Sequence, residues 1–139
     1  MIPITVTIDG RAVAAGLAKL SDQMAGRNLE AAATAGALVF DRAWKELFGS
    51  SSDPSIPGAP PRRQTGTYSR SIHPETLAVT RDSAEVQVGT NIDSPPYPVF
   101  LEYGTSRMPA HPIARPAFEQ NKVEAADVTM RALAKLLGI

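Results

Sequence analysis

The chain contains no cysteine and only two histidines, and these absences remove several kinds of site from consideration. Without a thiol there can be no disulfide bond, no thiolate metal site and no cysteine nucleophile, which suits a reducing cytoplasm. His73 and His111 are each followed by proline, and neither stands in a His-x-x-x-His, His-Glu-x-x-His or carboxylate-rich pattern. We therefore expect turn or packing roles for both histidines, and no metal site.

An excess of charge of either sign is also missing, because 14 Lys and Arg side chains balance 14 Asp and Glu side chains. The long-range field that drives non-specific binding to nucleic acid or membranes is therefore absent, and contact with DNA would need a local patch. The longest apolar runs fall well short of the roughly 18 residues that a membrane span requires. The first residues carry no base before their short apolar stretch, so we expect neither a signal peptide nor a membrane segment.

Motifs for phosphate binding and acyl transfer are lacking as well. Neither Gly-x-Gly-x-x-Gly nor Gly-x-x-x-x-Gly-Lys occurs, and there is no Gly-x-Ser-x-Gly elbow, so we expect no cofactor and no catalytic residues. Glu102 is a single acid in an apolar and aromatic setting, where a general-acid role can be imagined. It has no evident partner acid, and a carboxylate that caps a helix or pairs with arginine is the commoner case.

What is present fits one domain over residues 1–139, with 43% hydrophobic and 20% charged residues. Apolar residues alternate from Ile4 to Ile8, which predicts a strand that ends at Asp9-Gly10. The period then changes to that of an amphipathic helix through Val13, Leu17, Leu20 and Met24, which we expect Gly26 to break. A second helix is predicted from a cap at Asn28 to Phe48, with Gly49 as its stop.

The middle of this second helix is thin, because alanines crowd residues 31–37 around Gly36. Another backbone can therefore approach it closely. The sequence leaves open whether the sheet or a neighbouring subunit fills that role.

Residues 49–66 consist of turn-forming residues and predict a long loop. Loops of this length in a compact domain are usually functional or disordered, so we expect this one to order against a partner, with a role-free insertion as the alternative. Arg62, Arg63 and Arg70 form the basic cluster of the chain. They are suited to touching phosphates, although solvated arginines or pairing with acids of a neighbouring subunit is the simpler interpretation.

The second half predicts a helical turn over Tyr68 to Ile72, then a β-hairpin whose strands flank a turn at 81–83. Tyr97 to Tyr103 fits either a strand or a helical turn. A last helix is predicted from Pro116. Its apolar stripe comprises Val123, Ala126, Met130, Leu133 and Leu137. The fold class expected is α+β, with a small antiparallel sheet packed against two N-terminal helices and one C-terminal helix.

Two segments have a distinctive order of residues. In 59–72, two prolines stiffen an extended approach, Thr65-Gly66 makes a turn or cap, and Tyr68 and Ile72 can pin one helical turn to the core. In 97–118, Gly104 ends an aromatic element, and prolines at 109 and 112 favour an extended arm before Pro116 opens the last helix.

Together, in this order and separated by a hairpin, the two segments resemble the tailed-bacteriophage tail-component family, whose members act as neck or tail-completion proteins at the head–tail junction. The resemblance covers most of the chain. The residues that match its first part are Pro60, Pro61, Thr65, Gly66, Ser71 and Ile72. Those that match its second part are Tyr97, Glu102, Tyr103, Gly104, Thr105, Pro112, Arg115, Pro116 and Ala117.

The resemblance implies a non-enzymatic virion protein that is made in the bacterial cytoplasm and built into the neck. It implies a ring of copies, a hexamer or a dodecamer, that joins the head-closure or connector protein to the tail terminator or tail tube protein. DNA would pass through this ring without sequence recognition, and no membrane would be involved. The segments 49–66 and 104–116 are the expected contacts with neighbours, and Arg62 and Arg63 lie in the first of them.

Three alternatives stay open. The chain could instead form the tail-terminator ring that caps the tail tube. Both motifs could merely stabilise turns within one monomer. A hydrolase or nucleic-acid-modifying enzyme that uses Glu102 and His111 is the third, although no partner residues for such chemistry stand out.

Overall fold

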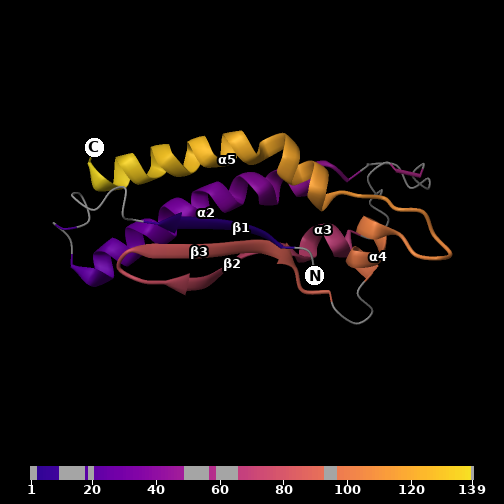
Figure 1. Cartoon of the computed structure of the whole chain (residues 1–139), viewed down its shortest axis with the longest axis horizontal. Helices are drawn as coiled ribbons and strands as arrows, with labels where there is room; N and C mark the ends of the chain where they lie inside the picture. Colours follow the sequence, from indigo (N-terminus) through magenta and orange to yellow (C-terminus); the bar gives the residue numbers. More distant parts are fainter. Residues whose placement is uncertain are drawn as a thin grey trace.

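The computed structural model describes residues 3–9, 18, 21–48, 57–58, 66–92 and 97–138, with only the backbone of residues 22 and 23. Helices and an antiparallel sheet form an α+β arrangement, as the sequence predicts (Figure 1). The elements are β1 (Ile4–Asp9), α2 (Asp22–Glu46), α3 (Thr67–Ser71), β2 (Ile72–Val79), β3 (Ser83–Thr90), α4 (Tyr97–Tyr103) and α5 (Ala114–Leu137).

The sheet has three antiparallel strands in the order β1-β3-β2, so β3 is central and the other two strands form the edges. The predicted first strand and the predicted hairpin are confirmed, and the hairpin is longer than expected because β2 already begins at Ile72. Val6 pairs with Val86, and Val86 pairs with Thr76 across the other side. Because side chains alternate between the faces of a strand, these residues point to the helix-covered face, while Glu85 and Gln87 point to the open face.

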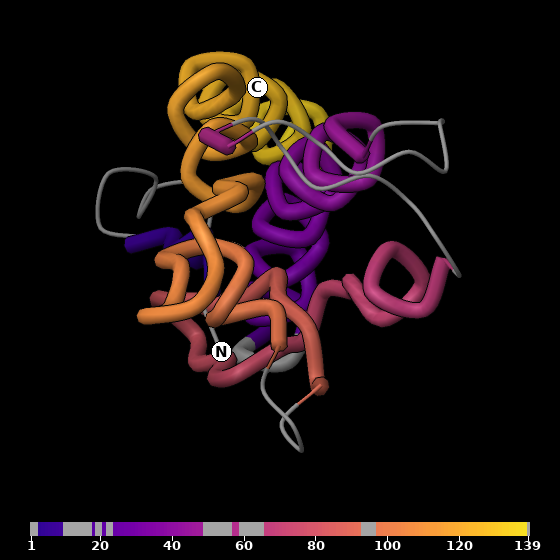
Figure 2. The backbone as a smooth tube through the Cα atoms, turned by 90° about the vertical axis from the view of Figure 1, so that its right-hand side faces the viewer, coloured from indigo at the N-terminus to yellow at the C-terminus, as the bar shows by residue number. Residues whose placement is uncertain are grey.

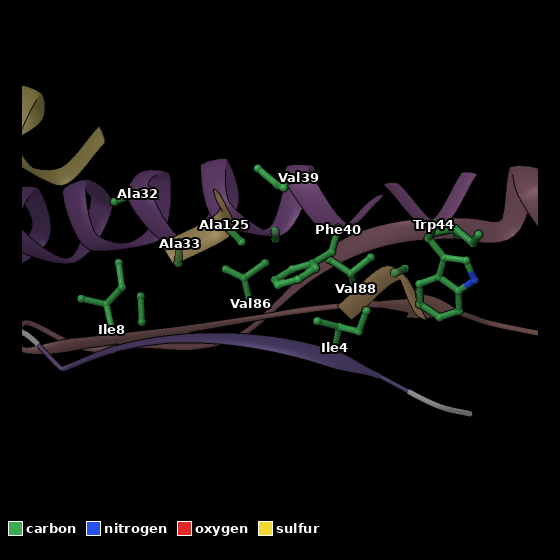
Figure 3. Close-up of a cluster of buried hydrophobic side chains, with 14 of the residues drawn as sticks. Ile4, Ile8, Ala32, Ala33, Val39, Phe40, Trp44, Val86, Val88 and Ala125 are labelled. Atoms are coloured by element: carbon green, nitrogen blue, oxygen red, sulfur yellow. The ribbon is translucent and has the colours of Figure 1, made fainter. Parts of the chain in front are cut away.

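Helix α2 supplies more of the core than any other element, because it lies along the covered face of the sheet (Figure 3). Leu29, Phe40 and Trp44 are buried on this helix and belong to one cluster with Val86 and Val88 of β3. One core cluster joins residues of β1, α2, α3, the hairpin and α5. In the end-on view the layers follow one another as α5, α2 and sheet (Figure 2).

The start of α2 differs from the prediction. Gly26 does not break the helix, and Asn28 is not its cap: both lie inside α2, which begins after Ser21, whose Oγ accepts a hydrogen bond from the backbone N–H of Met24 at 3.3 Å. Gly26 serves a close approach, since an added Cβ would lie 3.1 Å from Val79 Cγ1. Residues 10–17, 19 and 20, which carry most of the predicted first helix, lie outside the described residues, as does the predicted stop at Gly49.

At Gly36 the thin middle of α2 receives another element of the same chain, α5, while the sheet packs along α2 as well. A Cβ added at Gly36 would lie 3.3 Å from the backbone oxygen of Ala125 and would collide with the Thr129 hydroxyl. Thr129 is buried there and donates its hydroxyl to Ala125 O at 2.8 Å. Small residues on α2 thus let the two long helices pack closely.

Helix α5 starts at Ala114, two residues before the predicted Pro116, and its apolar stripe is only partly in the core. Leu133 is buried, but 77% of Val123 and 59% of Met130 are exposed, so the helix-spaced stripe is covered along only part of its length. The face that meets α2 is instead lined by small residues. They are Ala114, Ala117, Ala125 and Thr129.

Candidate functional site

Within the segment from Tyr97 to Phe118, the chain folds back on itself between α4 and α5 (Figure 1). Residues 104–112 of this connection are called the arm. Helix α4 ends as predicted at Gly104, whose N–H donates to Phe100 O at 2.7 Å. Gly104 has φ +76°, and an added Cβ would lie 2.9 Å from Ala110 N. Only glycine fits both the left-handed backbone and the close return of the arm.

The arm is a narrow turn rather than a simply extended chain. Thr105 N–H donates to Met108 O at 2.9 Å, and the Thr105 hydroxyl accepts from Arg107 N–H at 3.2 Å. On the way back, His111 N–H donates to Leu101 O at 2.6 Å, which ties the base of the arm to α4. Backbone hydrogen bonds and the Thr105 hydroxyl therefore hold the arm in place, in addition to the prolines and Gly104 that the sequence indicates.

Glu102 joins α4 to the start of α5. Its carboxylate accepts three backbone N–H groups, from Ile113 at 2.8 Å, Ala114 at 3.0 Å and Arg115 at 3.0 Å. Only 3% of Glu102 is exposed. The N-cap residue of α5, Ile113, has no capping side chain, and the first turn has no acid, so Glu102 supplies from a distance the negative charge that helix N-termini favour. The capping interpretation of Glu102 is confirmed.

The other residues of the second motif surround this cap. Tyr103 is 60% exposed, and the Arg115 guanidinium lies 5.7 Å from the centre of its ring, a cation–π distance. Thr105 lies in the exposed turn of the arm, and Pro112 is half-buried at its base. Pro116 sits in the first turn of α5, where proline is well tolerated. The motif therefore combines one buried cap with an exposed surface.

The first motif is described only from Gly66 onward, because Pro60, Pro61, Arg62, Arg63 and Thr65 lie outside the described residues. Gly66 has φ +80° and opens the short helix α3. Ser71 and Thr90 share a hydrogen bond of 2.5 Å between their hydroxyls, which fixes this helix to the hairpin.

The two motifs meet in space. Tyr68 and Ile72 are buried as predicted, and the Tyr68 ring lies edge-on to the Tyr97 ring with centroids 6.0 Å apart. Burial raises the pKa of the Tyr68 hydroxyl well above its usual value, an effect that the contact with Trp44 opposes. The aromatic cluster of Trp44, Phe48, Tyr68 and Tyr97 thus anchors both motifs to α2.

The long loop also touches the arm of its own chain. Gly58 N–H donates to Ala110 O at 2.9 Å, although most of residues 49–66 lie outside the described residues. The predicted contact of this loop with a neighbouring subunit stays a prediction, as does a phosphate contact of the arginine cluster, of which only Arg70 is described, exposed in α3.

The arrangement offers little for catalysis by Glu102 and His111. Both oxygens of Glu102 accept backbone N–H groups of α5, and His111 is buried at the base of the arm. Within the part of the chain that the structure describes, no three His, Asp or Glu side chains group closely enough to hold a metal ion. Among the same residues, no helix combines the length and the apolar character that crossing a membrane requires.

An apolar groove beside β1 was not foreseen from the sequence. It has a volume of about 390 Å³ and lies between β1 and α5, with Phe40, Phe118 and Met130 among the side chains that line it. Ala126, Met130 and Leu133 of the α5 stripe line this groove, but helical spacing does not show which part of a helix face stays uncovered.

Comparison with known proteins gives no further guide, since no protein-family model, no curated protein and no solved structure matches this chain.

Proposed function

We propose that this chain is a structural subunit of a tailed bacteriophage, one that forms a ring at the head–tail junction and continues the DNA channel from the connector toward the tail. The proposal rests on the resemblance of residues 59–72 and 97–118 to tail-component proteins of the neck. Its partners would be further copies of itself, the head-closure or connector protein and the tail terminator or tail tube protein, with DNA passing through without sequence recognition.

The observation that carries the proposal is that the two motifs form one fixed unit with an exposed tip. Tyr68 contacts Tyr97, Gly58 bonds to Ala110, and Glu102 joins α4 to α5 across the base of the arm. Loops fixed in this way bind with little loss of conformational entropy. An arm held by its own chain, with Tyr103 and Arg107 exposed, is therefore suited to docking on a neighbouring subunit.

The structural use of Glu102 favours an assembly role over an enzymatic one. A general acid must offer its carboxyl to a substrate, whereas this carboxylate is buried and bonded to the N-terminus of α5. The tail-terminator ring stays as the second structural candidate, because a capped arm serves either ring equally well.

The direct test is a deletion of this coding sequence from the phage that carries it, followed by negative-stain imaging of the particles. Filled heads and complete tails that fail to join are the expected result. Normal, infectious tailed particles would contradict the proposal, and tails of uncontrolled length would support the terminator instead.

A point variant tests the arm itself. Arg107→Glu reverses a charge at the exposed turn of the arm, and we expect it to prevent the joining of heads and tails when it replaces the natural chain. Arg131→Glu is the matched control, because Arg131 is exposed on α5 away from the arm. Both variants should fold, as judged by circular dichroism. If Arg107→Glu joined heads and tails as well as Arg131→Glu does, the arm would not be the contact.

A further inference from the structure

The two edges of the sheet are built differently. Edge strand β2 contains Pro74 and a register irregularity between Thr76 and Ala78. Proline and irregular pairing are devices that keep an edge from pairing with another chain. Edge strand β1 reads Ile-Thr-Val-Thr-Ile from Ile4 to Ile8, with neither proline nor charge, and pairs with β3 in unbroken register. No other described strand pairs with β1.

The free edge of β1 borders the apolar groove. The groove is lined on one side by β1 from Thr5 to Asp9 and on the other by residues of α5 that include Phe118, Met130 and Leu133. A second hollow of about 250 Å³ shares Thr5 and Phe118 with it and extends past Pro3 to Tyr103 and Arg115. Two hollows, the larger of them mainly apolar, therefore border the unprotected edge from Pro3 to Asp9.

Helix α5 adds exposed apolar side chains to the same side. Met130 lines the groove, and Val123 stands seven residues before it on a neighbouring part of the helix surface. Ala126 lies between them, exposed and also lining the groove. An unpaired strand edge and an exposed apolar helix face on one side of a small protein are typical of an interface.

We propose that this surface binds a second copy of the chain about a two-fold axis, with β1 pairing antiparallel to β1 of the second copy. The two three-stranded sheets then become one continuous sheet. The two-fold axis runs perpendicular to the joined sheet, so the helix-covered faces of both copies lie on the same side. The two α5 helices then lie on that side, one to each side of the junction. Their exposed apolar residues cover the groove between them.

A second copy fits this surface better than an unrelated segment, because the surface is complementary to itself. Along β1 the apolar residues alternate symmetrically about Val6, so the antiparallel pairing sets Ile4 opposite Ile8 of the second copy. The charges agree with this direction. Asp9 closes one end of the edge, Arg115 lies beside the other end, and the two-fold axis brings the acidic end of each copy to the basic end of the other.

The inference does not depend on the neck proposal. A dimer formed through β1 would protect this edge in the free chain before assembly, whereas head-to-tail contacts around a ring would use other surfaces, such as the arm.

The first experiment measures the mass of the full chain by sedimentation velocity across a range of concentrations. We expect a monomer–dimer equilibrium that Val123→Glu and Met130→Glu each weaken on the order of tenfold or more, the effect of altering a central interface residue. Met24→Glu is the matched control, since Met24 is 54% exposed on another helix, and it should leave the equilibrium unchanged.

The second experiment uses the absence of cysteine, because any disulfide must then come from an introduced thiol. With the axis at Val6, Thr5 lies opposite Thr7 of the second copy, within the roughly 7 Å between Cα atoms that a disulfide spans. Oxidation of mixed Thr5→Cys and Thr7→Cys chains should therefore give a covalent dimer. Chains with Glu75→Cys on the protected edge should not cross-link.

A chain that stays monomeric at all concentrations would overturn the proposal. A dimer that neither cross-links through β1 nor responds to Met130→Glu would overturn it equally, because the copies would then meet at another surface.

Discussion

Replacing Glu102 by alanine removes the one side chain that caps α5 from across the arm. Three backbone N–H groups, those of Ile113, Ala114 and Arg115, lose their acceptor at once. The carboxylate is buried, so water does not readily take its place. We expect the variant to lose stability and the arm to lose its fixed position on α5.

The magnitude follows from the three bonds. A hydrogen bond to a charged group contributes about 1.5–3 kcal/mol, and losing a helix cap typically costs about 1 kcal/mol. The bonds share one carboxylate, so their contributions do not add in full. We expect Glu102→Ala to lower the free energy of unfolding by about 3 kcal/mol, and the melting temperature by about 10 °C for a chain of this size.

Glu102→Gln refines the test, because it keeps the shape of the side chain. Its amide oxygen can still accept the N–H groups of Ile113 and Ala114, whereas its NH₂ group would face the N–H of Arg115. The expected loss is about half that of the alanine variant, roughly 1.5 kcal/mol.

Urea denaturation followed by circular dichroism gives these free energies by linear extrapolation. The control is Glu119→Ala, which removes an exposed carboxylate of the same helix that pairs with exposed Lys122 at 2.9 Å. It should cost less than about 1 kcal/mol, as exposed ion pairs do. If Glu102→Ala cost no more than Glu119→Ala, the capping account of the motif would be refuted.

Further predictions concern single positions. Gly104→Ala should cost about 2 kcal/mol or more in urea denaturation, because its Cβ would meet Ala110 N in a left-handed backbone, whereas Gly138→Ala, with open space around a similar φ, should cost about 1 kcal/mol. Gly36→Ala should lower the melting temperature by several degrees, because the added methyl would collide with Thr129. Adding Thr129→Ala to the same chain should restore stability, and no recovery would contradict this contact. Burial raises the pKa of Tyr68 in the folded chain, so the unfolded chain loses this proton at lower pH, and the free energy of unfolding should fall as the pH rises above about 10. Tyr68→Phe should lessen this fall. Identical dependence of stability on alkaline pH in both chains would refute the argument.

The strands and the last two-thirds of α2 could be predicted because their signals are local. Alternation of apolar residues defines β1 and the hairpin without knowledge of their partners. The segment from Tyr97 to Tyr103 is too short for its period to decide between strand and helix. Its helical form is held by contacts from elsewhere, including Tyr68 on the ring of Tyr97.

The errors come from contacts between distant residues. Gly26 looks like a helix breaker, but it lies inside α2, where Val79 and Thr80 leave little room for a side chain. The helical spacing of the α5 stripe shows which residues share a face, not what covers that face. The alanine-rich α2 accepts small residues of α5 instead, which leaves Val123 and Met130 exposed.

Glu102 lies between these two cases. Its isolation among aromatic residues marked it as unusual, and a capping role was the commoner expectation. The helix that it caps begins 12 residues later, at Ala114 on the far side of the arm, so no local pattern identifies the partner.

The proposed place of the protein in the phage neck is tested most directly by locating it in a reconstructed virion. A cryo-electron microscopy map of the intact particle should contain a ring of copies between the connector and the tail, in which the three-stranded sheet and the long helices α2 and α5 fit and the arm touches a neighbour. A map in which this chain fits only at another position, or at none, would contradict the proposal.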